Sequence, residues 1–187
     1  MKVELSPRER IVSTALRLFN ENGIHVTGID RIIEESGVAK KTFYNHFPSK
    51  NDLIAEYFHR KDNVWFERLE RHTSNPKFSG VERVLALFDA LYEWYLERDF
   101  TGCPFIRGLA DFGPDESDPK LVKCVDEHFQ RTSSLVQSLL KEARPKDAKK
   151  FVAQIMSLIA GATVVAQATG DAEVALLNKK MAATILR

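Results

Sequence analysis

Apolar residues recur every three to four positions along almost the whole chain of 187 residues, which is the period of an amphipathic α-helix. The first such stripe covers residues 11–19 and follows Ser6-Pro7-Arg8-Glu9, a sequence typical of a helix start with Ser6 as the N-terminal cap. Asn22-Gly23 predicts the end of this helix. Since no stretch shows the polar and apolar alternation of a β-strand, the pattern predicts an all-α fold.

Eight further helices are expected from the same periodicity and from the positions of glycine and proline. The second begins at Thr27-Gly28-Ile29-Asp30, with Asp30 in the position of a capping-box acid, and the last follows Gly170 with Asp171 as its cap. About nine helices predict a small domain over residues 1–50 and a larger helical bundle over 51–187. The later helices are expected at residues 27–36, 40–46, 49–73, 80–98, 105–112, 121–143, 147–168 and 172–186.

The first three helices have the spacing of a helix-turn-helix. Gly37 is expected in the turn between the second and third helices, and Val38 is expected as an apolar plug between them. The third helix is too short to be stable alone, so Phe43 and Phe47, four residues apart, are expected to hold it against the core. Its remaining side chains are then expected to face outward: Lys40, Lys41, Thr42, Tyr44, Asn45 and His46.

The charge of this region differs from that of the rest of the chain. The segment SGVAKKTFYNHFPSK, from Ser36 to Lys50, contains three lysines and no acid, whereas the net charge of the whole chain is only +1. A solvated surface would also explain three lysines, but lysine, threonine, tyrosine and asparagine are the side chains that reach DNA phosphates and base edges. Together with the helix-turn-helix spacing, the segment therefore predicts binding of double-stranded DNA.

The sequence TGIDRIIEESGVAKKTFYNHFPSKNDLI resembles the DNA-binding signature of the TetR family of bacterial transcriptional regulators. The resemblance spans about residues 8–58 and includes the Gly-Val turn, the Thr-Phe-Tyr-x-His-Phe core and the Pro-Ser-Lys-x-x-Leu lead into the fourth helix. The remaining two thirds of the chain agree with the family in architecture only. The segment GCPFIRGLADF is similar to one found in a broad subset of these regulators that is not tied to one ligand.

The resemblance implies that residues 1–50 form the DNA-binding domain and assigns roles to eight side chains. Thr27, Tyr44 and Lys50 are expected to contact phosphates. Two positions depart from the family pattern: Ala39 stands where a serine or threonine commonly caps the third helix, and Lys41 stands where a small residue is common. The residues expected at base edges or nearby phosphates, with His46 close by, are Lys40, Lys41, Thr42 and Asn45.

The resemblance also implies that residues 51–187 form a ligand-binding and dimerisation domain. A four-helix interface between two copies is expected at the last two helices, because small residues around Gly161 allow a close approach and the final helix carries an apolar stripe. Packing within one subunit is the alternative. The residues expected in the interface are Ala160, Gly161, Val164, Val174, Leu177 and Met181.

An effector pocket is implied among the aromatic side chains of the middle helices, although such residues more often belong to an ordinary core. An uncharged or aromatic small molecule is the favoured ligand. The candidate lining residues are Trp65, Phe88, Tyr92, Tyr95, Phe105, Phe112 and Phe129.

Other classes of protein fit the sequence less well. The five histidines have no metal-binding spacing, and the chain has no nucleophile elbow, phosphate-binding loop or dinucleotide turn, so neither an enzyme nor a metal or other cofactor is expected. Without a signal sequence or an unbroken apolar span, a cytoplasmic protein that does not contact membranes is expected. The predicted function is a ligand-responsive regulator, in the first place a repressor, that binds a (pseudo)palindromic operator as a homodimer. An activator or a protein-sensing helical module of the same fold is the alternative.

Overall fold

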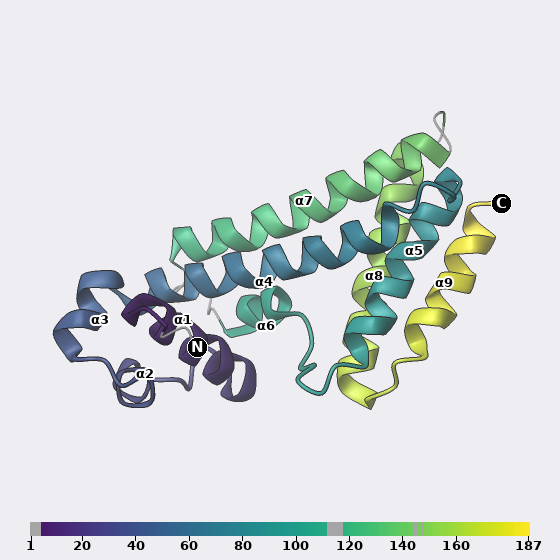
Figure 1. Ribbon diagram of the computed structural model, residues 1–187. Coiled ribbons are helices and arrows are strands. Elements are labelled where there is room, and N and C mark those ends of the chain that lie inside the picture. Colours follow the sequence, from purple (N-terminus) through teal and green to yellow (C-terminus); the bar gives the residue numbers. More distant parts are fainter. Residues whose placement is uncertain (1–4, 112–117, 144–145, 147) are drawn as a thin grey trace. The chain divides into compact units, whose positions relative to one another are not determined.

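The computed structural model describes residues 5–111, 118–143, 146 and 148–187, and within these ranges it contains nine α-helices and no strand (Figure 1). The all-α prediction is confirmed. The helices are α1 (Pro7–Asn22), α2 (Ile29–Ser36), α3 (Lys40–His46), α4 (Lys50–Thr73), α5 (Gly80–Tyr95), α6 (Pro104–Asp111), α7 (Pro119–Ala143), α8 (Ala148–Thr169) and α9 (Val174–Ile185).

The predicted ends of α1 are confirmed. The Ser6 hydroxyl accepts a hydrogen bond from the Glu9 backbone N–H at 3.2 Å, and Pro7 occupies the first helical position, where its missing N–H costs nothing. At the other end, the Gly23 N–H donates to the Phe19 carbonyl.

Several other boundaries differ from those predicted. Helix α2 begins at Ile29 with Gly28 as its cap, rather than with Thr27. Helix α9 begins at Val174, because the Asp171 carboxylate accepts from the Glu173 backbone N–H within the turn that precedes the helix. Helix α5 ends at Tyr95, short of the expected residue 98. The expected ends at Phe112 and Asp147 lie outside the described residues.

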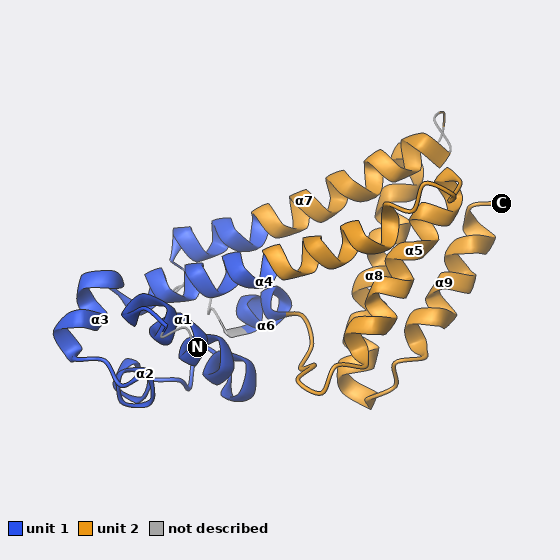
Figure 2. Ribbon diagram, viewed as in Figure 1, with its two compact units in different colours: residues 1–62, 104–126 blue, residues 63–103, 127–187 orange. Residues whose placement is uncertain are grey.

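The chain forms two compact units (Figure 2). The first contains residues 1–62 and 104–126, and the second contains residues 63–103 and 127–187. Helices α4 and α7 therefore belong partly to each unit. The first unit includes α6 and the beginning of α7 in addition to the helix-turn-helix, so its limits do not coincide with the expected domain of residues 1–50.

Each unit has its own apolar core. In the first unit, α2 and α3 pack against α1, and Phe19 of α1 meets Tyr57 of α4 edge to face. The rings of Phe58 and Phe105 stack with centroids 5.1 Å apart. In the second unit, α5 is buried on most sides, as its sequence predicted, and packs against α8 and α9. The buried residues of α5 are Val84, Ala86, Leu87, Phe88, Ala90, Leu91 and Tyr95.

A charged cluster joins α4 and α5 within the second unit. The Glu93 carboxylate accepts hydrogen bonds from Arg71 at 2.8 and 2.9 Å and contacts the His72 ring at 2.7 Å. These contacts, the one from Arg71 first, lower the pKa of Glu93 from 4.5 to about 2. The ionised carboxylate therefore stabilises the folded chain.

The Glu93→Gln variant should be less stable than the native protein above about pH 4.5. Because the pKa of Glu93 is depressed by folding, the native advantage is fully present above the unfolded pKa and is lost as the pH falls towards about 2. Urea unfolding at a series of pH values measures this difference. The exposed Glu70 of α4 provides the control variant Glu70→Gln. An equal effect of both substitutions at neutral pH would contradict the role given to Glu93.

Candidate nucleic-acid interface

The turn between α2 and α3 has the expected geometry. Gly37 has a φ of 63°, in the left-handed region where a side chain is strained, and its N–H donates to the Glu34 carbonyl. Val38 is 7% exposed, as expected for an apolar residue between α2 and α3. The turn thus fixes where α3 begins.

Two phenylalanines anchor α3 from its inner side. Phe43 is fully buried and Phe47 is 4% exposed, and their ring centroids lie 6.2 Å apart. The Tyr44 ring meets Phe43 edge to face at 5.3 Å, while the side chain as a whole stays 41% exposed. Packing therefore restricts the position of this tyrosine and leaves part of it accessible to a ligand.

The outer side of α3 is polar and basic. Five of the six side chains expected to face outward are exposed, whereas Thr42 is half-buried. Ala39, which directly precedes α3, provides no side-chain hydrogen bond to cap the helix, as its departure from the family pattern suggested. The exposed residues are Lys40, Lys41, Tyr44, Asn45 and His46.

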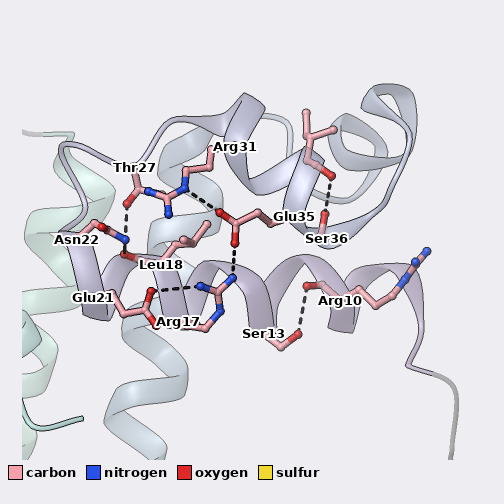
Figure 3. A network of polar contacts seen from close by, with 11 residues as sticks. Arg10, Ser13, Arg17, Leu18, Glu21, Asn22, Thr27, Arg31, Glu35 and Ser36 are labelled. Carbon is pink, nitrogen blue, oxygen red and sulfur yellow. Dashed lines mark hydrogen bonds and ion pairs between the residues drawn. The ribbon is translucent and has the colours of Figure 1, made fainter.

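Thr27 lies differently from the other expected contacts. Its side chain is 1% exposed, and its hydroxyl is 2.7 Å from the Gly23 carbonyl. The hydroxyl also lies 3.3 Å from the Leu18 carbonyl (Figure 3). The hydroxyl therefore joins the end of α1 to the segment before α2. In this arrangement the hydroxyl is turned inward, and the role supported by its contacts is to hold the start of α2. Its expected contact with a phosphate stays a prediction.

Lys50 lies at the first position of α4, after a well-formed cap. Ser49 and Asp52 form reciprocal hydrogen bonds, in which the Asp52 N–H donates to the Ser49 hydroxyl and the Asp52 carboxylate accepts from the Ser49 N–H at 3.1 Å. The Lys50 ammonium donates to the His25 carbonyl at 3.2 Å. This contact places a positive charge between the start of α4 and the segment before α2.

The start of α4 is also bound to the start of α7 within the first unit. The Asn51 amide donates to the Asp118 carboxylate at 2.9 Å, and Lys120 forms an ion pair with Asp52. Lys120, and then Ser49, lower the pKa of the Asp52 carboxyl. These polar contacts connect the helix that carries Lys50 to α7, and helical periodicity could not reveal them because the residues are distant in sequence.

A second network holds α2 against α1 (Figure 3). Glu35 of α2 accepts hydrogen bonds from Arg17 of α1 and from Arg31, the latter at 2.8 Å. Both guanidinium groups, Arg17 first, lower the pKa of the Glu35 carboxyl. Nearer the turn, the Arg10 guanidinium donates to the Gly37 carbonyl at 3.4 Å. The helix-turn-helix is thus held by charge pairs as well as by its apolar core.

The aromatic residues expected to line an effector pocket are mostly packed against neighbours. Phe105 stacks on Phe58 in the first unit, whereas the other described candidates belong to the second. The Tyr95 hydroxyl lies 2.8 Å from the Thr163 hydroxyl, and burial raises the pKa of Tyr95. Tyr92 donates to the Glu173 carboxylate at 2.9 Å. Phe88 is fully buried, Trp65 and Phe129 are half-buried, and Phe112 lies outside the described residues.

The residues expected in a dimer interface differ in their exposure. Val164, Leu177 and Met181 are 50%, 58% and 48% exposed, and a Cβ atom on Gly161 would meet nothing within 4 Å. Ala160 is half-buried. Val174 is only 9% exposed and belongs to the core of the second unit, so its expected place on an open interface is wrong. Val174 is covered because it packs with the core of the second unit, where α9 lies against α5 and α8.

Helix α8 is the most apolar helix in the described part of the chain. Over 22 residues it is long and apolar enough to cross a membrane by length and composition, with a mean hydropathy of 1.7 in its most apolar window. Only 28% of that window is buried within the structure. The composition of α8 therefore does not by itself exclude a membrane span, contrary to the expectation from the sequence, and the exposed apolar surface of α8 requires another explanation.

Metal-binding side chains do not gather in the described part of the chain. Among residues 5–111, 118–143, 146 and 148–187, no three histidine, cysteine, aspartate or glutamate side chains are grouped so that they could hold a metal ion. Cys103 is buried and Cys124 is half-buried, and neither forms a disulfide.

Comparison with protein families identifies the chain. The family model described as bacterial regulatory proteins of the tetR family matches residues 11–57, which contain the helix-turn-helix. The model described as the tetracyclin repressor-like C-terminal domain matches residues 80–179, more than half of the chain. The chain belongs to the TetR family. TetR-family proteins are DNA-binding transcriptional regulators rather than enzymes.

Individual relatives and solved structures are consistent with this assignment. An HTH-type transcriptional regulator of Staphylococcus aureus is 31% identical over 154 residues, which cover 74% of this chain and 80% of the relative. A TetR-family regulator from Streptomyces coelicolor, of known crystal structure, has a TM-score of 0.87 and 28% identity over 97% of this chain and 94% of its own. A transcriptional regulator from Saccharomonospora viridis, solved in complex with choline, has a TM-score of 0.77 and 21% identity over 96% of this chain and 94% of its own. At that identity, this last similarity concerns the fold alone.

Proposed function

We propose that this TetR-family regulator binds a (pseudo)palindromic operator as a cytoplasmic homodimer, represses transcription there and is released by a small-molecule effector. The basic, exposed side of α3 is the surface that meets DNA. Lys40, Lys41 and Asn45 face base edges or nearby phosphates, and Tyr44 and Lys50 face phosphates. Thr42 and His46 lie beside them, and Thr27 supports the start of α2 from within the domain.

The observation that carries the dimer is the uncovered apolar surface of α8 and α9. Val164 on α8 and Leu177 and Met181 on α9 are all about half exposed, although α8 is the most apolar helix described. Stable interfaces bury roughly 800 Å² on each partner, and two apolar helices from each copy are suited to supply such an area. A second copy would cover this surface and bring two DNA-reading helices to successive half-sites.

The proposed effector binds among the aromatic helices of the second unit. The same fold binds choline, a small organic cation, in the Saccharomonospora protein, which supports a small-molecule effector in general but not the uncharged or aromatic kind in particular. Helices α4 and α7 belong to both units, and the Asn51–Asp118 and Asp52–Lys120 pairs join their first turns beside Lys50. A ligand that favours one arrangement of α4 and α7 would change the spacing of the two DNA-reading helices and release the operator.

Selection of bound duplexes from a random pool, followed by sequencing, tests this function. A motif with two-fold symmetry is expected, with half-sites about one helical turn or a multiple of it apart. Transcription from promoters that carry the motif should rise when the gene is deleted, and a compound that acts as effector should dissociate the purified complex. A motif without symmetry would contradict the homodimer, and lower transcription on deletion would contradict repression.

Lys50→Ala is expected to weaken binding to all duplexes alike. Loss of one phosphate contact should flatten the plot of log affinity against log salt concentration by about one unit. Fluorescence anisotropy at several salt concentrations measures the slope. Lys149→Ala, an exposed lysine of α8 in the second unit, is the matched control and should leave the slope unchanged. Equal slopes for native protein and Lys50→Ala would remove Lys50 from the interface.

A further inference from the structure

An ion pair connects the first turns of the two helices of the helix-turn-helix. Asp30 is the second residue of α2 and Lys40 is the first residue of α3, and the carboxylate oxygen lies 3.4 Å from the ammonium nitrogen. Both side chains are largely exposed, at 88% for Asp30 and 67% for Lys40. In a helix-turn-helix, the N-terminal residues of the second helix are those that meet base edges. Lys40 therefore reaches the DNA with an acid beside it.

An acid at this place is unfavourable for general attraction to DNA. Phosphates repel a carboxylate, and a lysine paired with one contributes little net charge to phosphate binding. Glu35, another acid of α2, is turned towards α1 and held by Arg17 and Arg31 (Figure 3). Asp30 instead pairs with a residue of α3, and an ion pair this exposed contributes little to stability. Recognition of a polar group on DNA by the Asp30–Lys40 pair explains the position of Asp30 better than stability does.

The pair presents a donor and an acceptor side by side, as the edge of a base pair does. In the major groove a G·C pair offers the O6 and N7 acceptors of guanine next to the N4 donor of cytosine. Lysine is suited to guanine and aspartate to cytosine N4. A T·A pair offers O4 and N6 in the same order, but the thymine methyl group stands where guanine has its second acceptor. The Lys40–Asp30 pair therefore matches G·C best.

We propose that Asp30 and Lys40 together read one G·C pair in each half-site, with Lys40 donating to guanine and Asp30 accepting from cytosine. This inference rests on the proposed DNA-binding function and adds a specificity-determining residue to it. It also accounts for the acid at the start of α2, since cytosine rather than phosphate becomes its partner.

Parallel selections with native protein, Asp30→Ala and Glu34→Ala test the proposal. Glu34 is exposed on the same helix, and its replacement removes the same charge. Asp30→Ala should reduce the preference for G·C at one position of each half-site by about ten-fold, whereas Glu34→Ala should leave the motif unchanged. Lys40→Ala should relax the same position, and the double variant should lose little more, because the two residues act as one unit.

The outcomes separate this inference from the function on which it rests. The reading of G·C is overturned if the native protein and Asp30→Ala select the same motif. It is also overturned if Asp30→Ala strengthens binding to all sequences equally, as the removal of any acid would. In both cases the DNA-binding function stands. If the native protein retains no duplex at all, the proposed function fails as well. Circular dichroism melting of each variant verifies that it is folded.

Discussion

The double variant Val164→Glu/Met181→Glu is expected to be a monomer that binds its operator at least about 100-fold more weakly than the native protein. Both side chains are about half exposed on the apolar surface of α8 and α9. In a dimer, each substitution would bury an unpaired carboxylate in the apolar interface, which costs several kcal/mol. Loss of the second DNA-reading helix then removes half of the contacts made with the operator.

Sedimentation velocity measures the oligomeric state, and anisotropy measures operator affinity. The control is Val64→Glu, which introduces the same charge at a valine of α4 that is 54% exposed in the same unit. Val64→Glu should leave both the mass and the affinity unchanged. If the double variant kept the mass and affinity of the native protein, α8 and α9 would not form the interface.

Phe43→Ala should abolish operator binding by releasing α3. The side chain is fully buried beneath α3 and contacts the rings of Tyr44 and Phe47. Truncation of a buried phenylalanine costs about 3–5 kcal/mol. Because a helix of seven residues is not stable by itself, α3 should be the first element to detach.

Chemical denaturation and operator titration test this effect together. Phe43→Leu retains most of the buried volume and should lose less than about 1.5 kcal/mol while still binding DNA. Unchanged operator affinity in Phe43→Ala would mean that the anchored position of α3 is not needed for recognition.

Local sequence signals predicted the helix-turn-helix closely. Gly37 has the left-handed conformation expected of the turn, Val38 and the two phenylalanines of α3 are buried, and α3 spans residues 40–46 as expected. These features depend on residues within one or two helical turns of each other, so the order of residue types is sufficient to reveal them. Family resemblance then added which exposed side chains to expect at DNA.

The mistaken details depend on contacts between distant residues. The Thr27 hydroxyl contacts the carbonyls of Leu18 in α1 and of Gly23 directly after it. The Asp171 carboxylate accepts a hydrogen bond within the turn before α9. Neither residue therefore caps a helix as expected. Val174 belongs to the apolar stripe of α9 by sequence, but the packing of α9 on α5 and α8 decides which part of that stripe is covered. Periodicity identifies an apolar face and cannot say what covers it.

The most direct test of DNA recognition by α3 is a titration of native protein and of Lys40→Ala/Lys41→Ala with sheared genomic duplex DNA at low ionic strength. Both lysines are exposed at the start of α3, so the folded double variant should lose binding that the native protein retains. Tight, salt-sensitive binding by the native protein and at least about ten-fold weaker binding by the variant are expected. Failure of the native protein to bind any duplex, or equal affinities of the two proteins, would contradict recognition of DNA through α3.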